Sequence, residues 1–213
     1  MARLTGVGAI ALDFLRSGGK RLRPRLCREV CLSLTGGADR PGLATLEEAV
    51  ECFHKASLIH DDIQDGDATR YARAAVWKAH GVPMAVAVGD WLVAHGYRLI
   101  AGSGFPNAPE MLAATVASHE RLCEGQGDEI AGCGGYESVC ERKTGEGFAL
   151  AAALGALAAG ADPAPYREWG LCYGVLFQVL DDIADAGETP ELVRLRDVRR
   201  RRLAELPVGP FLR

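Results

Sequence analysis

Two aspartate clusters are the residues of this sequence best suited to chemistry. Asp61–Asp65 reads D-D-I-Q-D, and Asp181–Asp185 reads D-D-I-A-D. On a helix, the first and last carboxylates of each cluster project from the same face and repel one another. Mg²⁺ prefers such hard oxygen ligands, and it usually binds through a few carboxylates together with the phosphates of a substrate. The clusters therefore predict a magnesium site for a phosphorylated substrate.

The alternative interpretation of each cluster is a solvated acidic turn. Apolar residues lie just before both sets of carboxylates: Leu58, Ile59, Val179 and Leu180. A loose surface turn has no need of apolar flanks, whereas the end of a packed helix does. The flanking sequence therefore favours the metal site.

Helical periodicity runs through most of the chain and supplies the elements that must position these clusters. One apolar stripe leads into the first cluster with spacings of three and four residues: Leu46, Ala49, Val50, Phe53 and Ser57. Further helices are expected at 83–100, at 110–123 and from Asp162-Pro163 to about Asp185, because proline suits the first turn of a helix. No convincing run of alternating β-branched residues is present, so no sheet is predicted and the expected fold class is all-α.

The composition fits one globular domain over residues 1–213, since 48% of the residues are hydrophobic. The net charge of −4 gives no general case for binding nucleic acid. The longest apolar run, 148–161, is too short to span a bilayer, so no transmembrane segment is expected. Nothing at the start resembles a signal peptide, and the seven cysteines form no C-x-x-C pair, so we expect a cytoplasmic protein.

Short motifs occur in a characteristic order along the chain. Gly18–Pro24 reads G-G-K-R-L-R-P and precedes both aspartate clusters. Three dipeptides lie between the clusters: Gly89-Asp90, Gly125-Gln126 and Lys143-Thr144. The ordered set resembles the trans-isoprenyl diphosphate synthase (polyprenyl synthetase) family. The resemblance implies the isoprenoid synthase fold, which is an orthogonal and antiparallel helix bundle around a central cavity, and it implies a homodimer.

The resemblance also implies roles for individual side chains. Mg²⁺ would be held chiefly by Asp61, Asp65 and Asp181, with Asp62, Asp182 and Asp185 in support. The allylic diphosphate would be bound by Arg70, Lys143, Thr144 and Gln178. The isopentenyl diphosphate would be bound by Lys20, Arg23 and His54. The residues implied to be catalytic are Asp61, Asp65, Asp181 and Lys143.

The implied activity is the Mg²⁺-dependent condensation of an allylic prenyl diphosphate with isopentenyl diphosphate. Two other functions stay open on the sequence alone. A terpene cyclase or atypical prenyltransferase on the same fold would ionise an allylic diphosphate without using isopentenyl diphosphate. A non-catalytic subunit of a heteromeric synthase would do neither, although such subunits usually lose the aspartate motifs that this chain keeps.

The chain departs from the family pattern just after the first cluster. Family members usually carry two adjacent arginines followed by glycine, whereas this chain has Arg70, Tyr71 and Ala72. A phenol cannot form the charged fork that arginine forms with a phosphate, so the isopentenyl site is changed at Tyr71. Arg73 is expected to point elsewhere. On this reasoning, Tyr71→Arg should lower the KM for isopentenyl diphosphate.

The chain is also shorter than the family pattern. The stretch 127–136 is compact, and few residues follow Asp185. Ala204–Pro210 resembles the final helix of the family and its exit turn. Internal segments near 127–136 and after 185 are therefore either absent from the sequence given or naturally short.

Product length is predicted from the helix that leads to Asp61. In the family, the product grows along this helix, and bulky side chains stop it. Ala56 and Ser57, one turn before Asp61, are both small. Phe53 lies about one turn deeper, at a rise of about 1.5 Å per residue, so we predict a medium-chain product of about twenty carbons.

Overall fold

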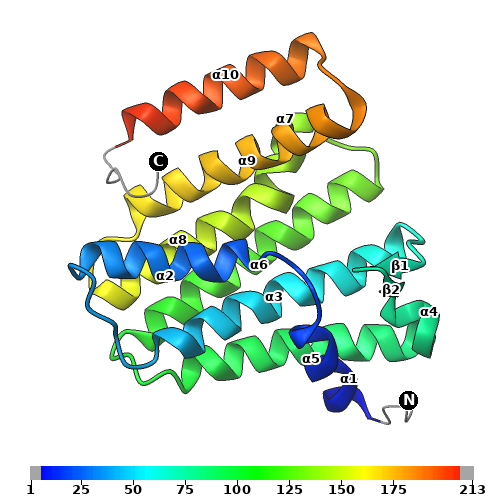
Figure 1. The fold of residues 1–213 in the computed structure, drawn as a ribbon, viewed down its shortest axis with the longest axis horizontal. Coiled ribbons are helices and arrows are strands. Elements are labelled where there is room, and N and C mark those ends of the chain that lie inside the picture. The colour runs from blue at the N-terminus through cyan, green and yellow to red at the C-terminus, as the bar shows by residue number, and fades with distance from the viewer. Residues whose placement is uncertain (1–5, 207–213) are drawn as a thin grey trace.

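A computed structural model describes residues 6–206, and in this range the fold is almost wholly helical (Figure 1). The helices in chain order are α1 (Val7–Arg16), α2 (Leu22–Leu34), α3 (Leu43–Gln64), α4 (Val76–His80), α5 (Val82–Ala101), α6 (Ala108–Ile130), α7 (Tyr136–Cys140), α8 (Glu146–Ala159), α9 (Ala164–Ala186) and α10 (Pro190–Glu205). A π-helical turn, η1 (Glu141–Gly145), joins α7 to α8. The predicted all-α class is confirmed.

Helix α8 is the centre of the larger core, and nearly all of its residues are buried. Its small residues allow close approach by both neighbours. A Cβ atom added at Gly155 would lie 2.9 Å from Val30 Cβ on α2, and one added at Gly170 on α9 would lie 2.9 Å from Ala149 Cα. The alanine- and glycine-rich run therefore packs α2 and α9 tightly against α8.

Helix α3 packs along α5 and shares a second core with α1. Helices α3 and α9 run in the same direction across the bundle, so their carboxyl ends lie on the same side of the molecule (Figure 1). This arrangement brings the two aspartate clusters to one end of the fold. No helix within residues 6–206 has the length and apolar character needed to cross a membrane.

The prediction that the chain has no sheet is wrong for one short segment. Strands β1 (Thr69–Arg70) and β2 (Arg73–Ala74) pair antiparallel, with Arg70 opposite Arg73. Tyr71 and Ala72 form the turn at φ values of 53° and 57°, a region that residues other than glycine rarely adopt. Two-residue strands leave no alternating pattern, and this turn lacks the glycine that normally signals a hairpin. The sequence therefore carried no sign of it.

Helix boundaries differ from the predicted ones by a few residues. Helix α9 begins at Ala164, and the Asp162 carboxylate accepts a hydrogen bond from the Ala164 backbone N–H at 3.0 Å. Helix α6 extends further in both directions than the predicted 110–123. Of the expected exit turn at Ala204–Pro210, residues 207–210 lie outside the described residues.

Candidate active site

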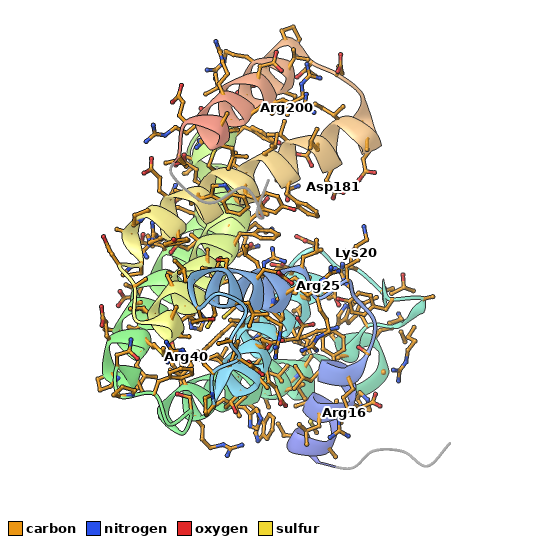
Figure 2. All side chains as sticks on the ribbon, turned by 60° about the vertical axis from the view of Figure 1, so that its left-hand side comes forward. Arg16, Lys20, Arg25, Arg40, Asp181 and Arg200 are labelled. Atoms are coloured by element: carbon orange, nitrogen blue, oxygen red, sulfur yellow. The ribbon has the colours of Figure 1, made fainter. Side chains whose placement is uncertain are left out.

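A cavity of about 1060 Å³ lies between α3, α6 and the carboxyl end of α9. Figure 2 shows Asp181 and Lys20 on opposite sides of its mouth. The predicted site residues on its wall are Lys20, Arg23, His54, Asp61, Arg70, Lys143, Thr144, Gln178 and Asp181. Four predicted carboxylates are not on this wall: Asp62, Asp65, Asp182 and Asp185. The structure therefore gathers most of the predicted site around one space.

The first aspartate cluster ends α3, and Asp61 is its cavity-facing member. Burial raises the pKa of the Asp61 carboxyl, and the Lys143 ammonium, 3.9 Å away, opposes that shift. Asp65 is exposed. Asp61 is thus a carboxylate held partly out of water, where a divalent cation would stabilise its charge.

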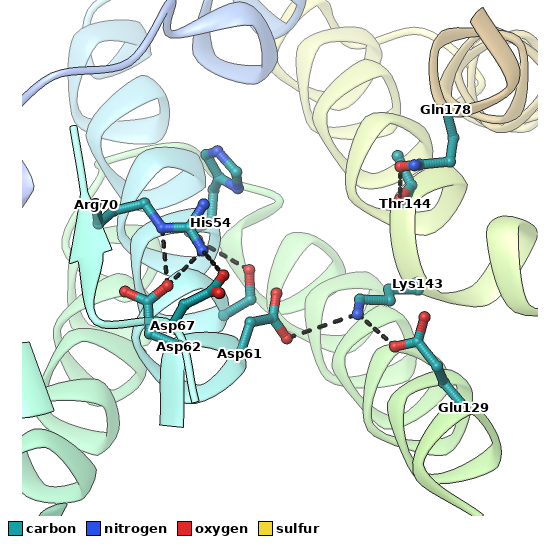
Figure 3. A network of polar contacts seen from close by, with 10 residues as sticks. His54, Asp61, Asp62, Asp67, Arg70, Glu129, Lys143, Thr144 and Gln178 are labelled. Carbon is teal, nitrogen blue, oxygen red and sulfur yellow. Dashed lines mark hydrogen bonds and ion pairs between the residues drawn. The ribbon is translucent and has the colours of Figure 1, made fainter. Parts of the chain in front are cut away.

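Asp62 is turned away from the cavity and is 1% exposed. Its Oδ1 accepts hydrogen bonds from Arg70 Nε, at 2.8 Å, and from Arg70 Nη2 (Figure 3). Asp67 lies 3.4 Å from the same guanidinium. Asp62 Oδ2 has no hydrogen-bond partner among the described residues. The geometry makes Asp62 the group that orients Arg70, and its predicted support of a metal stays a prediction.

The second aspartate cluster ends α9 and is tied to its surroundings by a chain of hydrogen bonds. Thr144 Oγ1 donates to Gln178 Oε1 at 2.9 Å, and Gln178 Nε2 donates to Asp182 Oδ1 at 2.9 Å. The Tyr136 hydroxyl donates to the second Asp182 oxygen. These donors engage both oxygens of Asp182, whereas Asp181 faces the cavity.

Lys143 and Thr144 lie on η1, and π-helical turns are frequent at functional sites. Lys143 Nζ donates to Glu129 Oε2 at 2.5 Å while it lies 3.9 Å from Asp61 Oδ1, so it connects α6 with α3 (Figure 3). Sequence reasoning missed Glu129 and Tyr136. The nearby Gly125-Gln126 motif could have pointed to Glu129, which lies one helical turn further on, but nothing local pointed to Tyr136.

Glu146 fixes the other end of this π-helical turn and is 2% exposed. Its carboxylate accepts hydrogen bonds from Ser118 at 2.5 Å, from Arg121 at 2.8 Å and from Arg167 at 2.6 Å. Burial acts to raise the pKa of Glu146, but the hydrogen bonds from Arg121 and Ser118 and the charge of Arg167 outweigh it and hold the pKa below its usual value. A buried, ionised anchor thus supports the element that carries Lys143.

Basic groups form the opposite wall of the cavity. The Arg23 guanidinium lies 4.4 Å from the centre of the Phe148 ring, and its Nη1 is 3.4 Å from His54 Nε2. Burial lowers the pKa of His54 to about 2 and that of Arg23 to about 10. Histidine is therefore neutral and arginine charged near pH 7. Within the described residues, neither Lys20 nor Arg23 forms an ion pair, so both suit an incoming anion.

Tyr71 also lines this wall, at the position of the second arginine in the family pattern. Arg73 ion-pairs with Asp13 at 3.1 Å and is not on the cavity wall. The expectation that Arg73 points elsewhere is confirmed. The missing arginine is therefore not replaced by its neighbour.

Aromatic rings from three helices meet at Phe53, and two of them, Phe53 and His119, line the cavity. The Phe53 ring centre lies 5.1 Å from that of Tyr97 on α5 and 6.0 Å from that of His119 on α6. Tyr97 Oη and His119 Nδ1 are hydrogen-bonded at 3.1 Å. Small residues, Ala56 and Ser57, line the wall above them. The predicted stop at Phe53 thus lies beside two further rings that sequence reasoning missed.

The two aspartate clusters could share Mg²⁺ only if the ion lay in the cavity between the two helix ends. Within residues 6–206, no three His, Cys, Asp or Glu side chains lie close enough together to hold an ion by themselves. Asp61 and Asp181 instead line one space from the ends of two helices. Mg²⁺ usually takes one or two carboxylates and completes its shell with substrate phosphates and water. This hard-oxygen set therefore suits Mg²⁺ that binds together with a diphosphate.

A helical bundle with two aspartate-bearing helix ends at one cavity defines a protein of the isoprenoid synthase class. Residues 7–194 match the family model described as polyprenyl synthetase, and the chain belongs to that family. The predicted family and fold are confirmed.

Relatives of known name support this assignment. The geranylgeranyl diphosphate synthase of Cereibacter sphaeroides is 35% identical, over 84% of this chain and 65% of its own length. The short chain isoprenyl diphosphate synthase of Methanothermobacter thermautotrophicus is 33% identical, over 80% of this chain and 55% of its own length. The chain thus spans between about half and two thirds of the length of the curated relatives it matches.

Solved structures show the same architecture. An isoprenoid synthase family member from Thermotoga neapolitana superposes with a TM-score of 0.83 at 25% identity, over 96% of this chain and 86% of that one. A polyprenyl synthase from Caulobacter crescentus, solved with calcium and isoprenyl diphosphate, gives a TM-score of 0.71 at 31% identity, over 87% of this chain and 63% of that one.

Proposed function

We propose that this protein condenses an allylic prenyl diphosphate with isopentenyl diphosphate in a Mg²⁺-dependent reaction. One observation carries the proposal: a single cavity is lined by members of both aspartate clusters, by Lys20 and Arg23, which form no ion pair within residues 6–206, and by apolar side chains. Diphosphates need the charged groups, and prenyl chains need the apolar ones. The names of the curated relatives, which are prenyl diphosphate synthases, support the same activity.

In this proposal, Lys20 and Arg23 bind the isopentenyl diphosphate while neutral His54 keeps the Arg23 guanidinium in place. Arg70, Lys143 and Gln178 hold the allylic diphosphate near Asp61 and Asp181. Mg²⁺ bound by these carboxylates and Asp65 would neutralise and orient the departing diphosphate.

The chain's own residues then shape the reaction. The allylic C–O bond breaks, and diphosphate leaves with the electron pair. The isopentenyl double bond supplies the electrons of the new C–C bond, and loss of one proton restores an alkene. Apolar side chains such as Leu58 and Phe177 line the cavity and limit the access of water to the cation.

We also propose a product of about twenty carbons, because small wall residues precede the ring cluster of Phe53, Tyr97 and His119 at a depth of about two helical turns from Asp61. Several relatives are named geranylgeranyl diphosphate synthases, which supports this length. A homodimer is proposed as well, supported by exposed valines on two adjacent helices, Val82, Val86 and Val116. Sedimentation of the purified protein tests the dimer.

The activity is tested by incubating the purified protein with Mg²⁺ and farnesyl diphosphate, with and without isopentenyl diphosphate. Released diphosphate and prenyl products are measured by a coupled assay and mass spectrometry. The proposal expects elongated product and diphosphate only when both substrates are present, and neither in EDTA. Diphosphate release without isopentenyl diphosphate indicates a cyclase. No release under any condition indicates a non-catalytic subunit.

A further inference from the structure

Lys55 is a fully buried cation that the proposed mechanism does not use. Its side chain is 0% exposed, and it does not line the cavity. Its Nζ donates to the Ser17 carbonyl at 2.5 Å and to the Gly18 carbonyl at 3.1 Å. The same atom lies 4.1 Å from the centre of the Tyr71 ring. Two hydrogen bonds and cation–π contacts with Tyr71 and, at 5.1 Å, with the Phe14 ring thus surround the ammonium.

The backbone that Lys55 holds is the glycine turn just before the basic wall. Gly18 and Gly19 have φ values of 30° and 92°, so both adopt conformations that other residues avoid. The Tyr71 ring packs against the same turn, beside Lys55. A Cβ atom added at Gly18 would lie 2.8 Å from Tyr71 Cβ, and one added at Gly19 would lie 3.1 Å from Tyr71 Oη. The turn therefore packs against the Tyr71 ring and the Lys55 ammonium, which also contact each other.

Burial and neighbouring charges have opposing effects on the pKa of Lys55. Burial lowers the pKa of Lys55 to about 8, while the Glu51 carboxylate opposes the shift and Arg21 adds to it. Glu51 is one turn earlier on α3, is 1% exposed, and has an Oε2 atom without a hydrogen-bond partner among the described residues. Burial raises the pKa of Glu51, and the charges of Arg21 and Lys55 oppose that shift, so an acidic and a basic group are buried one turn apart on α3.

We propose that Lys55 and Tyr71 form a clamp on the Gly18–Gly19 turn, and that this clamp holds Lys20 and Arg23 in place for the diphosphate of isopentenyl diphosphate. This inference rests on the proposed function. Lys55 is a positioning residue, because it acts on the substrate only through the turn. It places a positive charge beneath the aromatic ring at the position where the family pattern has an arginine.

The clamp changes the expectation for Tyr71→Arg. Lys55 Nζ lies 4.1 Å from the centre of the Tyr71 ring. An arginine in place of Tyr71 would therefore bring its guanidinium against the Lys55 ammonium. Like charges at such a distance repel one another strongly away from bulk water. Tyr71→Arg alone should therefore weaken binding, whereas Tyr71→Arg combined with Lys55→Met should recover part of it.

Titration calorimetry of isopentenyl diphosphate in EDTA isolates this subsite, because the basic wall binds an anion without metal and the aspartates do not. For Lys55→Met we expect the Kd to rise about tenfold, which corresponds to the entropy of fixing the backbone of one residue. Lys78→Met is the matched control, since Lys78 Nζ also lies over a ring, 5.5 Å from the centre of the Trp77 ring, but the Lys78 side chain is exposed. Its Kd should equal that of the wild type.

Two further measurements separate the clamp from a general structural role. Steady-state kinetics of Lys55→Met should show a raised KM for isopentenyl diphosphate, with the KM for the allylic substrate and kcat changed by less than about twofold. Tyr71→Leu should raise the Kd, and Tyr71→Phe, which keeps the ring, should not. Circular dichroism tests whether Lys55→Met folds. If it does not fold, the Tyr71 variants still decide the question.

The outcomes are distinct. If Lys55→Met is folded and binds isopentenyl diphosphate like the wild type, the clamp is refuted while the proposed function stands. Equal losses for both substrates, or failure of the double variant to bind better than Tyr71→Arg, also refute it. If the wild type itself does not bind isopentenyl diphosphate in EDTA and makes no elongated product, the proposed function fails and the clamp fails with it.

Discussion

Ala72 occupies the turn between β1 and β2 at a φ of 57°, at the position where the family pattern carries glycine. A left-handed conformation brings Cβ against the following carbonyl and costs roughly 1–2 kcal/mol for a residue other than glycine. Ala72 is exposed, so its methyl group contributes little packing. Ala72→Gly should remove this strain.

The gain is reduced because glycine makes the unfolded chain more flexible, by about 0.4–1 kcal/mol. Taken at the middle of both ranges, the difference leaves a net stabilisation of about 0.8 kcal/mol. For a chain of this size, that corresponds to a rise in Tm of about 1–4 °C. Thermal and urea unfolding followed by far-UV circular dichroism would measure it.

The matched control is Ala68→Gly, because Ala68 is also exposed and precedes the same hairpin, but does not have a positive φ. This change adds flexibility to the unfolded chain without relieving strain, so it should lower the stability by about 0.4–1 kcal/mol. If Ala72→Gly unfolds at the same temperature as the wild type or below it, the turn is not strained as the backbone angles indicate.

Three further predictions follow from the site. Asp61→Ala or Asp181→Ala should abolish turnover and leave Tm nearly unchanged, because both side chains face the cavity; turnover by the wild type in EDTA would contradict the metal role. Glu146→Gln should lower the free energy of unfolding by about 2–3 kcal/mol at pH 7. The pKa of Glu146 is lower in the folded protein than in the unfolded chain, so the stability it contributes is present above the unfolded pKa and is lost as the pH falls through the folded pKa. Urea unfolding should therefore show the stabilities of wild type and Glu146→Gln converging in acid. A difference that stays constant with pH would count against this account. Phe53→Ala should lengthen the product and Ser57→Phe should shorten it, each by about one isoprene unit in mass spectra, and an unchanged distribution would exclude α3 as the floor.

The predicted residues that the fold brings to the cavity are those whose sequence signal is local. Both clusters, the basic segment and Lys143-Thr144 lie in short motifs, and the helices that carry them show clear periodicity. Positions three or four residues apart on one helix share a face, and Gln178 and Asp182, four residues apart on α9, are accordingly joined by a hydrogen bond.

The residues that were missed act through contacts between distant parts of the chain. Lys55 lies 38 residues from Ser17, and Tyr136 lies 46 residues from Asp182. A lysine within an amphipathic helix ordinarily indicates a solvated position, and only the folded glycine turn makes its burial favourable. The aromatic floor is a similar case, because Tyr97 and His119 lie on helices that the sequence does not place next to Phe53.

The doubled aspartate in each cluster has a common physical explanation. Successive residues on a helix point roughly 100° apart, so two adjacent carboxylates face in different directions. In the first cluster, Asp61 faces the cavity while Asp62 turns inward to Arg70. In the second, Asp181 faces the cavity while Asp182 is engaged by Gln178 and Tyr136. One aspartate of each pair is thus held by hydrogen bonds at the helix end, and under the proposed function the other is the carboxylate that would meet a metal ion.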